Sequence, residues 1–324
     1  MTRVLITTVP FAEKNKLPLE LLFAEGIDYV INPHNKKLTA DQLAELIPGF
    51  DAVIAGTEEI NAHVLSKADK LKFISRVGIG LDSVDLLKAR EKNIKVSYTA
   101  DAPAPAVAEL TVGLMFSLLR FTQLSNIQMH QGYWHRYFGR RFSEVTIGII
   151  GAGRIGSKVI KHILGFNPIK ILVNDPILSL EFKNIPNLEW VSKEEIYKDA
   201  DVISLHLPLN SETRNMISKV ELQKMKSDAL IINTSRGGII NEDDLFEVMT
   251  EGHLGGAAID VFIDEPYFGK LRQIDRCILT AHMGSMSIDC RSQMEIEATK
   301  EVIRFINREK LQGEIPDSEY ELLK

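Results

Sequence analysis

Polar side chains follow four of the strands that we predict in the second half of the chain. In open parallel sheets, ligands bind beyond the carboxyl ends of the strands, so these residues are functional candidates by position. A histidine can transfer a proton near neutral pH, and an arginine offers a planar, charged fork to a carboxylate. Taken singly, either residue is more often structural at such a place. The candidates are His206, Arg236, Asp260 with Glu265, and His282.

A glycine-rich stretch earlier in the chain carries a more specific signal. The apolar run Val145–Ile150 leads into a G-x-G-x-x-G turn, and a segment with helical periodicity follows. A second apolar run then ends at Asp175. Strand, turn, helix and acid in this order are typical of a dinucleotide-binding βαβ unit.

Each residue of this turn has a physical task. Gly151 permits the tight turn, Gly153 lets a pyrophosphate approach the backbone, and Gly156 lets the helix pack closely on the strand. The helix then begins at Arg154 and Ile155, whose backbone N–H groups and positive dipole end favour a phosphate. The stretch therefore predicts a binding site for a dinucleotide.

The acid at the end of the second strand indicates which dinucleotide is bound. Asp175 lies 19 residues after Gly156, about the separation expected of an acid that accepts hydrogen bonds from the adenosine ribose. The same carboxylate repels a 2′-phosphate. Residues 176–180 contain no Arg or Lys that would attract one. The sequence therefore predicts NAD rather than NADP.

Length and charge limit the possible classes of function. A chain of 324 residues exceeds the usual size of one hydrophobic core, so we expect two domains. A net charge of −6 argues against nucleic acid or an anionic membrane as a partner. The two cysteines, Cys277 and Cys290, match no metal-binding spacing or disulfide framework, and we predict no metal site.

Two apolar stretches resemble targeting or membrane segments in composition but not in length. The run Val4–Val9 is too short for a signal peptide and lacks a cleavage site, so we predict a first β-strand there. The stretch Val107–Leu119 contains Glu109 and is too short to span a bilayer. We therefore expect a cytoplasmic protein.

Short apolar runs alternate with helical segments along residues 1–100, which predicts a parallel sheet covered on both faces. The predicted strands are Val4–Thr8, Tyr29–Asn32, Ala52–Ala55, Lys72–Ser75 and Lys95–Ser97. The predicted helices are Leu17–Glu25, Ala40–Leu46, Ala62–Ser66 and Val84–Lys92. A long helix over residues 103–130 should then link this domain to the next one.

The second half repeats the same alternation around the glycine-rich turn. Beyond the two strands of that unit, we predict strands at Asp201–His206, Ala229–Thr234, Gly256–Asp260 and Cys277–Thr280. Six strands make up a doubly wound nucleotide-binding domain. An amphipathic helix at about 289–307 should return the chain to the first domain.

The chain resembles the NAD-dependent D-2-hydroxyacid dehydrogenases, a family that includes phosphoglycerate, glycerate and D-lactate dehydrogenases. The resemblance extends over nearly the whole chain in a series of ordered motifs. Besides the glycine-rich turn, they are Arg76-Val-Gly-Ile-Gly80-Leu-Asp-Ser-Val-Asp85, Ala106-Val-Ala-Glu-Leu110, His206-Leu-Pro208, Ser235-Arg-Gly-Gly238, Asp260-Val-Phe-Ile-Asp-Glu-Pro266 and Thr280-Ala-His-Met-Gly284.

The resemblance implies a fold of two doubly wound parallel-sheet domains. An NAD-binding Rossmann domain, residues 101–288, would be inserted in a flavodoxin-like substrate-binding domain formed by residues 1–100 and 289–324. The family places its active site between the two domains.

The resemblance also implies the roles of three catalytic residues. Reduction of a 2-oxo acid needs a proton at the carbonyl oxygen as the hydride arrives. His282 would supply that proton, and Glu265 would orient the imidazole. Arg236 would bind the substrate carboxylate and the carbonyl oxygen. Backbone N–H groups of residues 77–80, namely Val77, Gly78, Ile79 and Gly80, would bind the carboxylate from the other side.

Further cofactor contacts follow from the resemblance, and two of them have a second interpretation. His206 either lines the nicotinamide pocket or caps a loop. Asp260 either bonds the nicotinamide amide or supports the loop that carries Glu265. The predicted cofactor residues are Gly151, Gly153, Arg154, Ile155, Gly156, Asp175, His206, Pro208, Thr213, Thr234, Asp260 and Gly284.

We predict an NAD-dependent oxidoreductase acting on a small anionic D-2-hydroxy or 2-oxo acid. The best single guess is 3-phosphoglycerate and 3-phosphohydroxypyruvate; glycerate with hydroxypyruvate, or glyoxylate, is the alternative. A different class, an NADH-sensing protein of the co-repressor type, retains the same three catalytic residues. Departures from the family pattern at Pro103 and Ala281, and the short spacing from Glu265 to His282, leave the substrate open. The resemblance suggests a homodimer joined through the nucleotide-binding domains.

Overall fold

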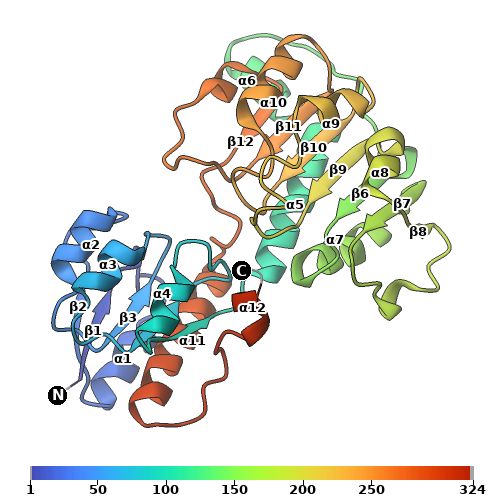
Figure 1. Ribbon diagram of the computed structural model, residues 1–324. Helices are drawn as coiled ribbons and strands as arrows, with labels where there is room; N and C mark the ends of the chain where they lie inside the picture. Colours follow the sequence, from blue (N-terminus) through green and yellow to red (C-terminus); the bar gives the residue numbers. More distant parts are fainter. Residues whose placement is uncertain (1, 322–324) are drawn as a thin grey trace. The chain divides into compact units, whose positions relative to one another are not determined.

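The computed structural model describes residues 2–321 and divides them into two compact units (Figure 1). Unit 1 contains the residues up to Pro103 and those from Ser285 onward, and unit 2 is the continuous segment Ala104–Gly284. Each unit is built on one fully parallel sheet, of five strands in unit 1 and seven in unit 2. The predicted fold class is therefore confirmed.

Unit 1 has the strand order β2-β1-β3-β4-β5, which is the flavodoxin-like order. The inner strands β3 and β4 are buried along their whole length, as expected when helices cover both faces of a parallel sheet. The strands are β1 (Arg3–Ile6), β2 (Asp28–Ile31), β3 (Ala52–Ala55), β4 (Phe73–Arg76) and β5 (Lys95–Tyr98).

The helices of unit 1 begin where the sequence provides capping side chains. Thr39 and Asn61 accept hydrogen bonds from the first turns of α2 and α3, and Asp85 does so for α4. The helices are α1 (Leu17–Ala24), α2 (Ala40–Leu46), α3 (Ala62–Lys67), α4 (Leu86–Glu91), α11 (Ile288–Ile306) and α12 (Asp317–Glu321).

The last long helix returns the chain to unit 1, as the sequence predicts. Helix α11 packs on α1 and on β3, β4 and β5. Phe305 of this helix stacks on Phe73 with ring centroids 4.6 Å apart, and the Ser75 hydroxyl donates to the Ala298 carbonyl at 2.9 Å. Its buried face therefore packs the C-terminal segment onto the sheet of unit 1.

Unit 2 has the strand order β12-β11-β10-β9-β6-β7-β8, the nucleotide-binding order with one added edge strand. The strands are β6 (Thr146–Ile150), β7 (Lys170–Asn174), β8 (Leu188–Trp190), β9 (Val202–Leu205), β10 (Leu230–Asn233), β11 (Gly256–Ile259) and β12 (Cys277–Leu279). The helices are α5 (Ala104–Leu119), α6 (Thr122–His130), α7 (Arg154–Leu164), α8 (Lys193–Asp199), α9 (Lys219–Lys224) and α10 (Glu242–Thr250), with short 3-10 turns η1 (Phe142–Glu144), η2 (Leu180–Phe182) and η3 (Lys270–Gln273).

Two sequence predictions for unit 2 were wrong. The sheet has seven strands rather than six, because a three-residue edge strand, β8, is too short to display a periodic pattern. The predicted helix over 103–130 is two helices that are bent by 65°. The break lies at Phe121, whose backbone is left-handed with φ 53°. Helix α5 is buried among β10, β11 and α7, whereas α6 has no buried residue and so no core contact that would keep it collinear.

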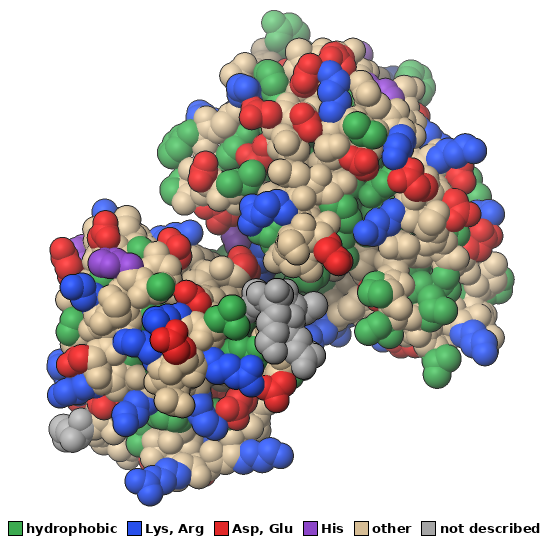
Figure 2. Space-filling view, in the orientation of Figure 1, with side chains coloured by type: hydrophobic (Ala, Val, Ile, Leu, Met, Phe, Trp, Pro, Cys, Tyr) green, Lys and Arg blue, Asp and Glu red, His purple; other side chains and the backbone are tan. Residues whose placement is uncertain are grey.

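No single helix of residues 2–321 has both the length and the apolar content needed to cross a membrane. Only the bent pair Ala104–Arg120 and Thr122–His130 reaches these limits, and α5 is a largely buried core helix of unit 2. On the visible face, Figure 2 shows acidic and basic side chains interspersed over each unit, without a continuous basic stripe.

Candidate active site

The glycine-rich turn connects β6 to α7 with little space around its backbone. Gly151 has φ +96°, and a Cβ there would lie 2.3 Å from the His206 carbonyl oxygen. A Cβ on Gly156 would lie 1.9 Å from the Gly151 carbonyl oxygen. By contrast, a Cβ on Gly153 would meet no atom within 4 Å. The turn is therefore closed on its protein side and open at Gly153.

The open side of this turn is the start of α7. Gly153 is the residue before the first turn, and it provides no side-chain cap for the helix. The first N–H groups of a helix have no intrahelical acceptor and carry partial positive charge. The backbone at Arg154 and Ile155 is therefore suited to a pyrophosphate, and an open glycine beside it fits the group that NAD would place there.

Asp175 lies directly beside the turn. Its carboxylate accepts the Ala152 N–H at 2.7 Å and the Ile177 N–H at 2.8 Å. These bonds connect the end of β7 to the glycine-rich turn. A carboxylate has about four acceptor positions, so two bonds leave capacity for the hydroxyl groups of a ribose.

His206 follows β9 and packs behind the turn. Burial lowers the pKa of its imidazole to about 3, so the ring is neutral at physiological pH. The ring Nε2 lies 3.0 Å from the Ser204 hydroxyl. The buried Nδ1 has no hydrogen-bond partner among residues 2–321. His206 thus supports the backbone of the turn.

The remaining predicted cofactor residues hold loops at the same edge of the sheet. The Thr213 hydroxyl donates to the Pro208 carbonyl at 2.6 Å and so closes the loop after β9. The Thr234 hydroxyl lies 2.8 Å from that of Thr111 on α5. These contacts are structural, and cofactor contacts by the three residues stay predictions.

Arg236 stands in a tightly bonded loop after β10. The Asn233 side chain donates to the Arg236 carbonyl at 2.8 Å, and Nη1 of Arg236 donates to the Ser235 carbonyl at 2.7 Å. Gly237 brings this loop against the loop that carries Glu265, because a Cβ there would lie 2.0 Å from the Phe262 carbonyl carbon. Two of the three predicted catalytic residues therefore lie on loops in direct contact.

His282 and Glu265 form a hydrogen-bonded pair. The imidazole Nδ1 lies 2.9 Å and 3.0 Å from the two carboxylate oxygens. Glu265 also accepts the Phe262 N–H at 3.1 Å. Both side chains are partly exposed, at 36% for His282 and 23% for Glu265. With Nδ1 bound to the carboxylate, Nε2 is the nitrogen without a partner in the described chain, and it can exchange a proton with a bound molecule.

Asp260 organises the loop of His282. It is 1% exposed and accepts the Thr280 hydroxyl at 2.6 Å. It also accepts the Met283 and Gly284 N–H groups, both at 2.9 Å. These three bonds favour a supporting role for Asp260 over a bond to the nicotinamide amide. The loop that it supports is that of His282 rather than that of Glu265.

Sequence reasoning missed two residues of this edge. Gly237 permits the close approach of the loops that carry Arg236 and Glu265, and the Gly-Gly pair after Arg236 could have indicated it. Glu242, at the start of α10, accepts the Ile263 N–H at 2.8 Å and so fixes the loop of Glu265. Partial burial, with the nearby acids Asp264 and Asp243, raises the pKa of its carboxyl. No sequence motif could have indicated that contact.

In unit 1, the predicted carboxylate-binding loop follows β4. The Val77 N–H donates to the Ala55 carbonyl at 2.8 Å, and the Gly78 N–H donates to the Thr99 hydroxyl at 2.7 Å. The N–H groups of Ile79 and Gly80 have no acceptor within residues 2–321. Of the four amides predicted to bind substrate, two thus have internal partners and two are available.

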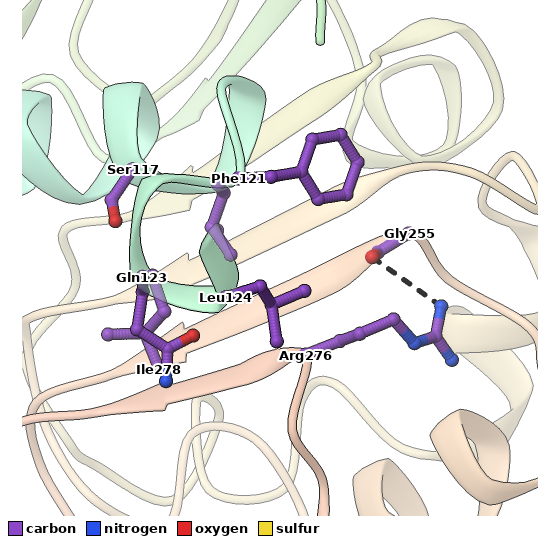
Figure 3. Close-up of a pocket in the computed structure, with 8 residues that line it drawn as sticks. Ser117, Phe121, Gln123, Leu124, Gly255, Arg276 and Ile278 are labelled. Atoms are coloured by element: carbon purple, nitrogen blue, oxygen red, sulfur yellow. Dashed lines mark hydrogen bonds between the residues drawn. The ribbon is translucent and has the colours of Figure 1, made fainter. Parts of the chain in front are cut away.

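Two other features were considered as sites. A crevice between α5, α6 and β12 has a volume of about 10 Å³, which is room for about one water molecule (Figure 3). Its lining includes Phe121 and Arg276 but none of the predicted site residues. The described residues contain no group of three or more His, Cys, Asp or Glu that could hold a metal ion.

Comparisons with known proteins agree on one family. Residues 112–284 match the family described as D-isomer specific 2-hydroxyacid dehydrogenase, NAD binding domain. The chain is 35% identical to the hydroxypyruvate reductase of Thermotoga maritima, over 83% of this chain and 89% of that protein. It is 36% identical to the D-3-phosphoglycerate dehydrogenase of Methanocaldococcus jannaschii, over 82% of this chain but only 52% of that protein.

The fold comparison extends over the whole chain. The crystal structure of the TT0316 protein from Thermus thermophilus superimposes with a TM-score of 0.88 and 29% identity. The match covers 97% of this chain and all of that one.

Proposed function

Because the chain belongs to the D-isomer specific 2-hydroxyacid dehydrogenases, we propose that it reduces hydroxypyruvate, a small 2-oxo acid, with NADH as the hydride donor. The chain is an oxidoreductase of this family, and NAD is its cofactor. The observation that carries the proposal is the hydrogen-bonded pair of His282 and Glu265. The loop that carries Glu265 is in contact with the loop of Arg236.

The glycine-rich turn of unit 2 would hold the cofactor. Backbone N–H groups at Arg154 and Ile155 would bind the pyrophosphate, and Asp175 would accept hydrogen bonds from the adenosine ribose. The bound cofactor supplies a hydride to C2 of the substrate. The neutral ring of His206 adds no charge beside this site.

His282 would deliver the proton that the reduction requires. Its Nε2 would donate to the carbonyl oxygen of the substrate, while Nδ1 stays bonded to Glu265. The carboxylate fixes the orientation of the ring and stabilises the imidazolium form. Proton transfer from a positioned histidine contributes about 10²–10⁴-fold to the rate.

Arg236 would bind the carboxylate of the substrate and polarise the carbonyl group. Its loop is rigid, because Asn233 bonds its backbone and Ser235 accepts from its guanidinium group. A fixed, permanently charged fork matches a carboxylate with two parallel hydrogen bonds. The Ile79 and Gly80 amides of unit 1 would bind the same carboxylate.

Charge near the carboxylate-binding loop favours an unphosphorylated substrate. The loops after β3 and β4, residues 56–59 and 77–82, expose the acids Glu59 and Asp82 but no Lys, Arg or His, while Glu58 and the neighbouring Arg76 are buried. A phosphate group beside these acids would be repelled. The chain spans about half the length of the matched phosphoglycerate dehydrogenase and nearly all of the hydroxypyruvate reductase. On the charge argument, we place 3-phosphohydroxypyruvate, the substrate predicted first from the sequence, behind hydroxypyruvate.

NADH oxidation with a set of 2-oxo acids tests the proposal. We expect the highest kcat/KM with hydroxypyruvate, compared with glyoxylate, pyruvate and 3-phosphohydroxypyruvate. The variant Arg236→Ala should lose most of this turnover while its Kd for NADH stays near that of the wild type. A protein that binds NADH tightly but reduces none of these acids would instead be an NADH sensor, and our proposal would be wrong.

We also propose that the protein is a homodimer joined through unit 2. The segment after α6 exposes large apolar side chains, with Trp134 76% and Phe138 99% exposed. Exposed apolar area of this kind is typical of a protein interface. Light scattering coupled to size exclusion should give twice the chain mass, and Trp134→Ser with Phe138→Ser should lower it. A monomeric wild type would refute the dimer.

A further inference from the structure

The loop after β4 is held by a residue that the sequence analysis did not single out. Gly78 and Thr99 exchange two hydrogen bonds: the Gly78 N–H donates to the Thr99 hydroxyl at 2.7 Å, and the Thr99 N–H donates to the Gly78 carbonyl at 3.2 Å. Thr99 directly follows β5 and is 2% exposed. The first half of the loop is therefore anchored to the neighbouring strand.

The second half of the loop is held by a buried guanidinium group. Nε and Nη2 of Arg76 both donate to the Gly80 carbonyl, at 3.2 Å and 3.0 Å. Arg76 is the last residue of β4 and is 3% exposed. A buried charge is costly unless it is hydrogen-bonded. The two bonds from Arg76 therefore hold the Gly80 carbonyl in place.

These bonds decide which way the two available amides point. In a trans peptide the C=O and the N–H lie on opposite edges of one plane. The Gly78 carbonyl and the Ile79 N–H share such a plane, so the bond from Thr99 turns the Ile79 N–H away from β5. Arg76 fixes the peptide plane after Gly80, which contains the Gly80 carbonyl and the Leu81 N–H, so the plane that contains the Gly80 N–H lies between two fixed planes. Successive N–H groups that point outward form a small anion-binding concavity.

We propose that Thr99 and Arg76 are positioning residues for the substrate carboxylate, holding the Ile79 and Gly80 amides ready to bind it. The inference rests on the proposed function, because it assumes that a 2-oxo acid binds at this loop. Neither side chain would touch the substrate. Each acts through the backbone that it fixes.

Replacement of the Thr99 hydroxyl gives the direct test. Thr99→Val keeps the shape of the side chain but leaves the Gly78 N–H without its acceptor. We expect the KM for hydroxypyruvate to rise about 5- to 100-fold, the usual effect of losing a buried hydrogen-bond partner. We expect kcat and the Kd for NADH to change less than twofold, because the lost interaction stabilises the bound substrate and the transition state equally. Thr99→Ser retains the hydroxyl and should restore the KM.

Ser97→Ala provides a matched control for a purely structural effect. Ser97 lies on β5 two residues before Thr99, is fully buried, and donates to the Ser75 hydroxyl at 3.1 Å. This variant also removes a buried hydroxyl from the same unit, so it should lower Tm without raising the KM. A rise in KM equal to that of Thr99→Val would overturn the inference.

Arg76→Lys keeps the test decisive if Thr99→Val fails to fold. A lysine retains the charge but loses the fork that bonds the Gly80 carbonyl twice, so the KM should again rise while kcat is retained. An unchanged KM in Arg76→Lys and Thr99→Val, in a wild type that reduces hydroxypyruvate, would overturn this inference alone. A wild type that binds NADH but reduces none of the 2-oxo acids would overturn the proposed function and this inference together.

Discussion

The two parallel sheets of this protein each contain a point where the strand order reverses, and the residues that line the two points differ. In unit 2 the reversal lies between β6 and β9, and in unit 1 between β1 and β3. Such a reversal opens a crevice at the carboxyl ends of the strands, where doubly wound folds bind their ligands. The topology therefore offers one possible ligand crevice in each unit.

The reversal point of unit 2 is kept open by residues without side chains. Gly151 and Gly156 allow the turn and the helix to pack closely, and Gly153 faces open space at the start of α7. The start of α7 carries partial positive charge, which favours a phosphate. The lack of side chains at these three glycines therefore allows the turn to close and leaves space for a ligand at Gly153.

The reversal point of unit 1 is filled by polar side chains. Glu58 accepts the Thr7 hydroxyl and the Gly56 N–H. Arg291 of α11 donates to the Thr8 hydroxyl at 2.8 Å and to Glu295 at 2.7 Å. These groups satisfy one another and are nearly all buried. The fold therefore supplies a crevice in both units, while the residues that line it decide whether a ligand can enter.

The largest expected effect concerns the catalytic edge of unit 2. His282→Ala should lower kcat by about 10²–10⁴-fold, because the carbonyl oxygen loses its proton donor. Steady-state NADH oxidation measures it, with His162→Ala on the exposed side of α7 as the control variant. A near-normal kcat in His282→Ala would show that His282 is not the proton donor, and unit 2 would then lack its proposed catalytic residue.

Removal of the Arg291 cation at the reversal point of unit 1 should cause a large loss of stability but no loss of cofactor binding. Arg291→Met leaves Glu295, which is 3% exposed, without its cation. Breaking a buried ion pair costs about 3–5 kcal/mol in the free energy of unfolding. Urea unfolding followed by circular dichroism measures the loss.

The double variant Arg291→Met with Glu295→Leu should recover most of that stability, since no buried charge is left alone. The Kd for NADH, from fluorescence titration, should match the wild type in both variants. A weakened Kd would mean that the filled point of unit 1 contributes to nucleotide binding, contrary to the comparison.

A moderate effect is expected where unit 2 distinguishes between cofactors. Asp175→Ala should reduce the ratio of kcat/KM for NADH over NADPH by about tenfold, as one charge-assisted hydrogen bond and one repulsive charge are lost. Asp175→Asn separates the two causes, because it keeps an acceptor for the Ala152 N–H while removing the charge. If the ratio stays at its wild-type value in both variants, Asp175 does not read the ribose.

The last expected effect is a pH dependence of stability from His206. Its pKa is about 3 in the folded protein and about 6.5 in an unfolded chain, so below pH 6.5 the unfolded state binds the extra proton. This contribution to stability is present above pH 6.5 and is lost as the pH falls toward 3. His206→Gln lacks it, so the difference in Tm between wild type and variant should narrow between pH 7 and pH 4. Parallel curves would show that His206 does not titrate in this way.

The sequence by itself determined the side-chain chemistry of unit 2 and the class of the fold. The glycine-rich turn stood out because each of its glycines is needed at a particular place. Arg236, Glu265 and His282 were predicted from their positions after strands and from the resemblance to the family. The alternation of strands and helices predicted two parallel sheets. Local pattern failed only where it was short or exposed, at β8 and at the break near Phe121.

The tertiary structure alone decided how the backbone groups are used. The sequence marks residues 77–80 as a loop but cannot tell that Thr99 and Ala55 occupy the first two amides and leave those of Ile79 and Gly80. Nor can it tell that Arg291, more than 280 residues from Thr8, fills the reversal point of unit 1. Every residue has the same backbone groups, so their availability depends on partners that only folding brings together.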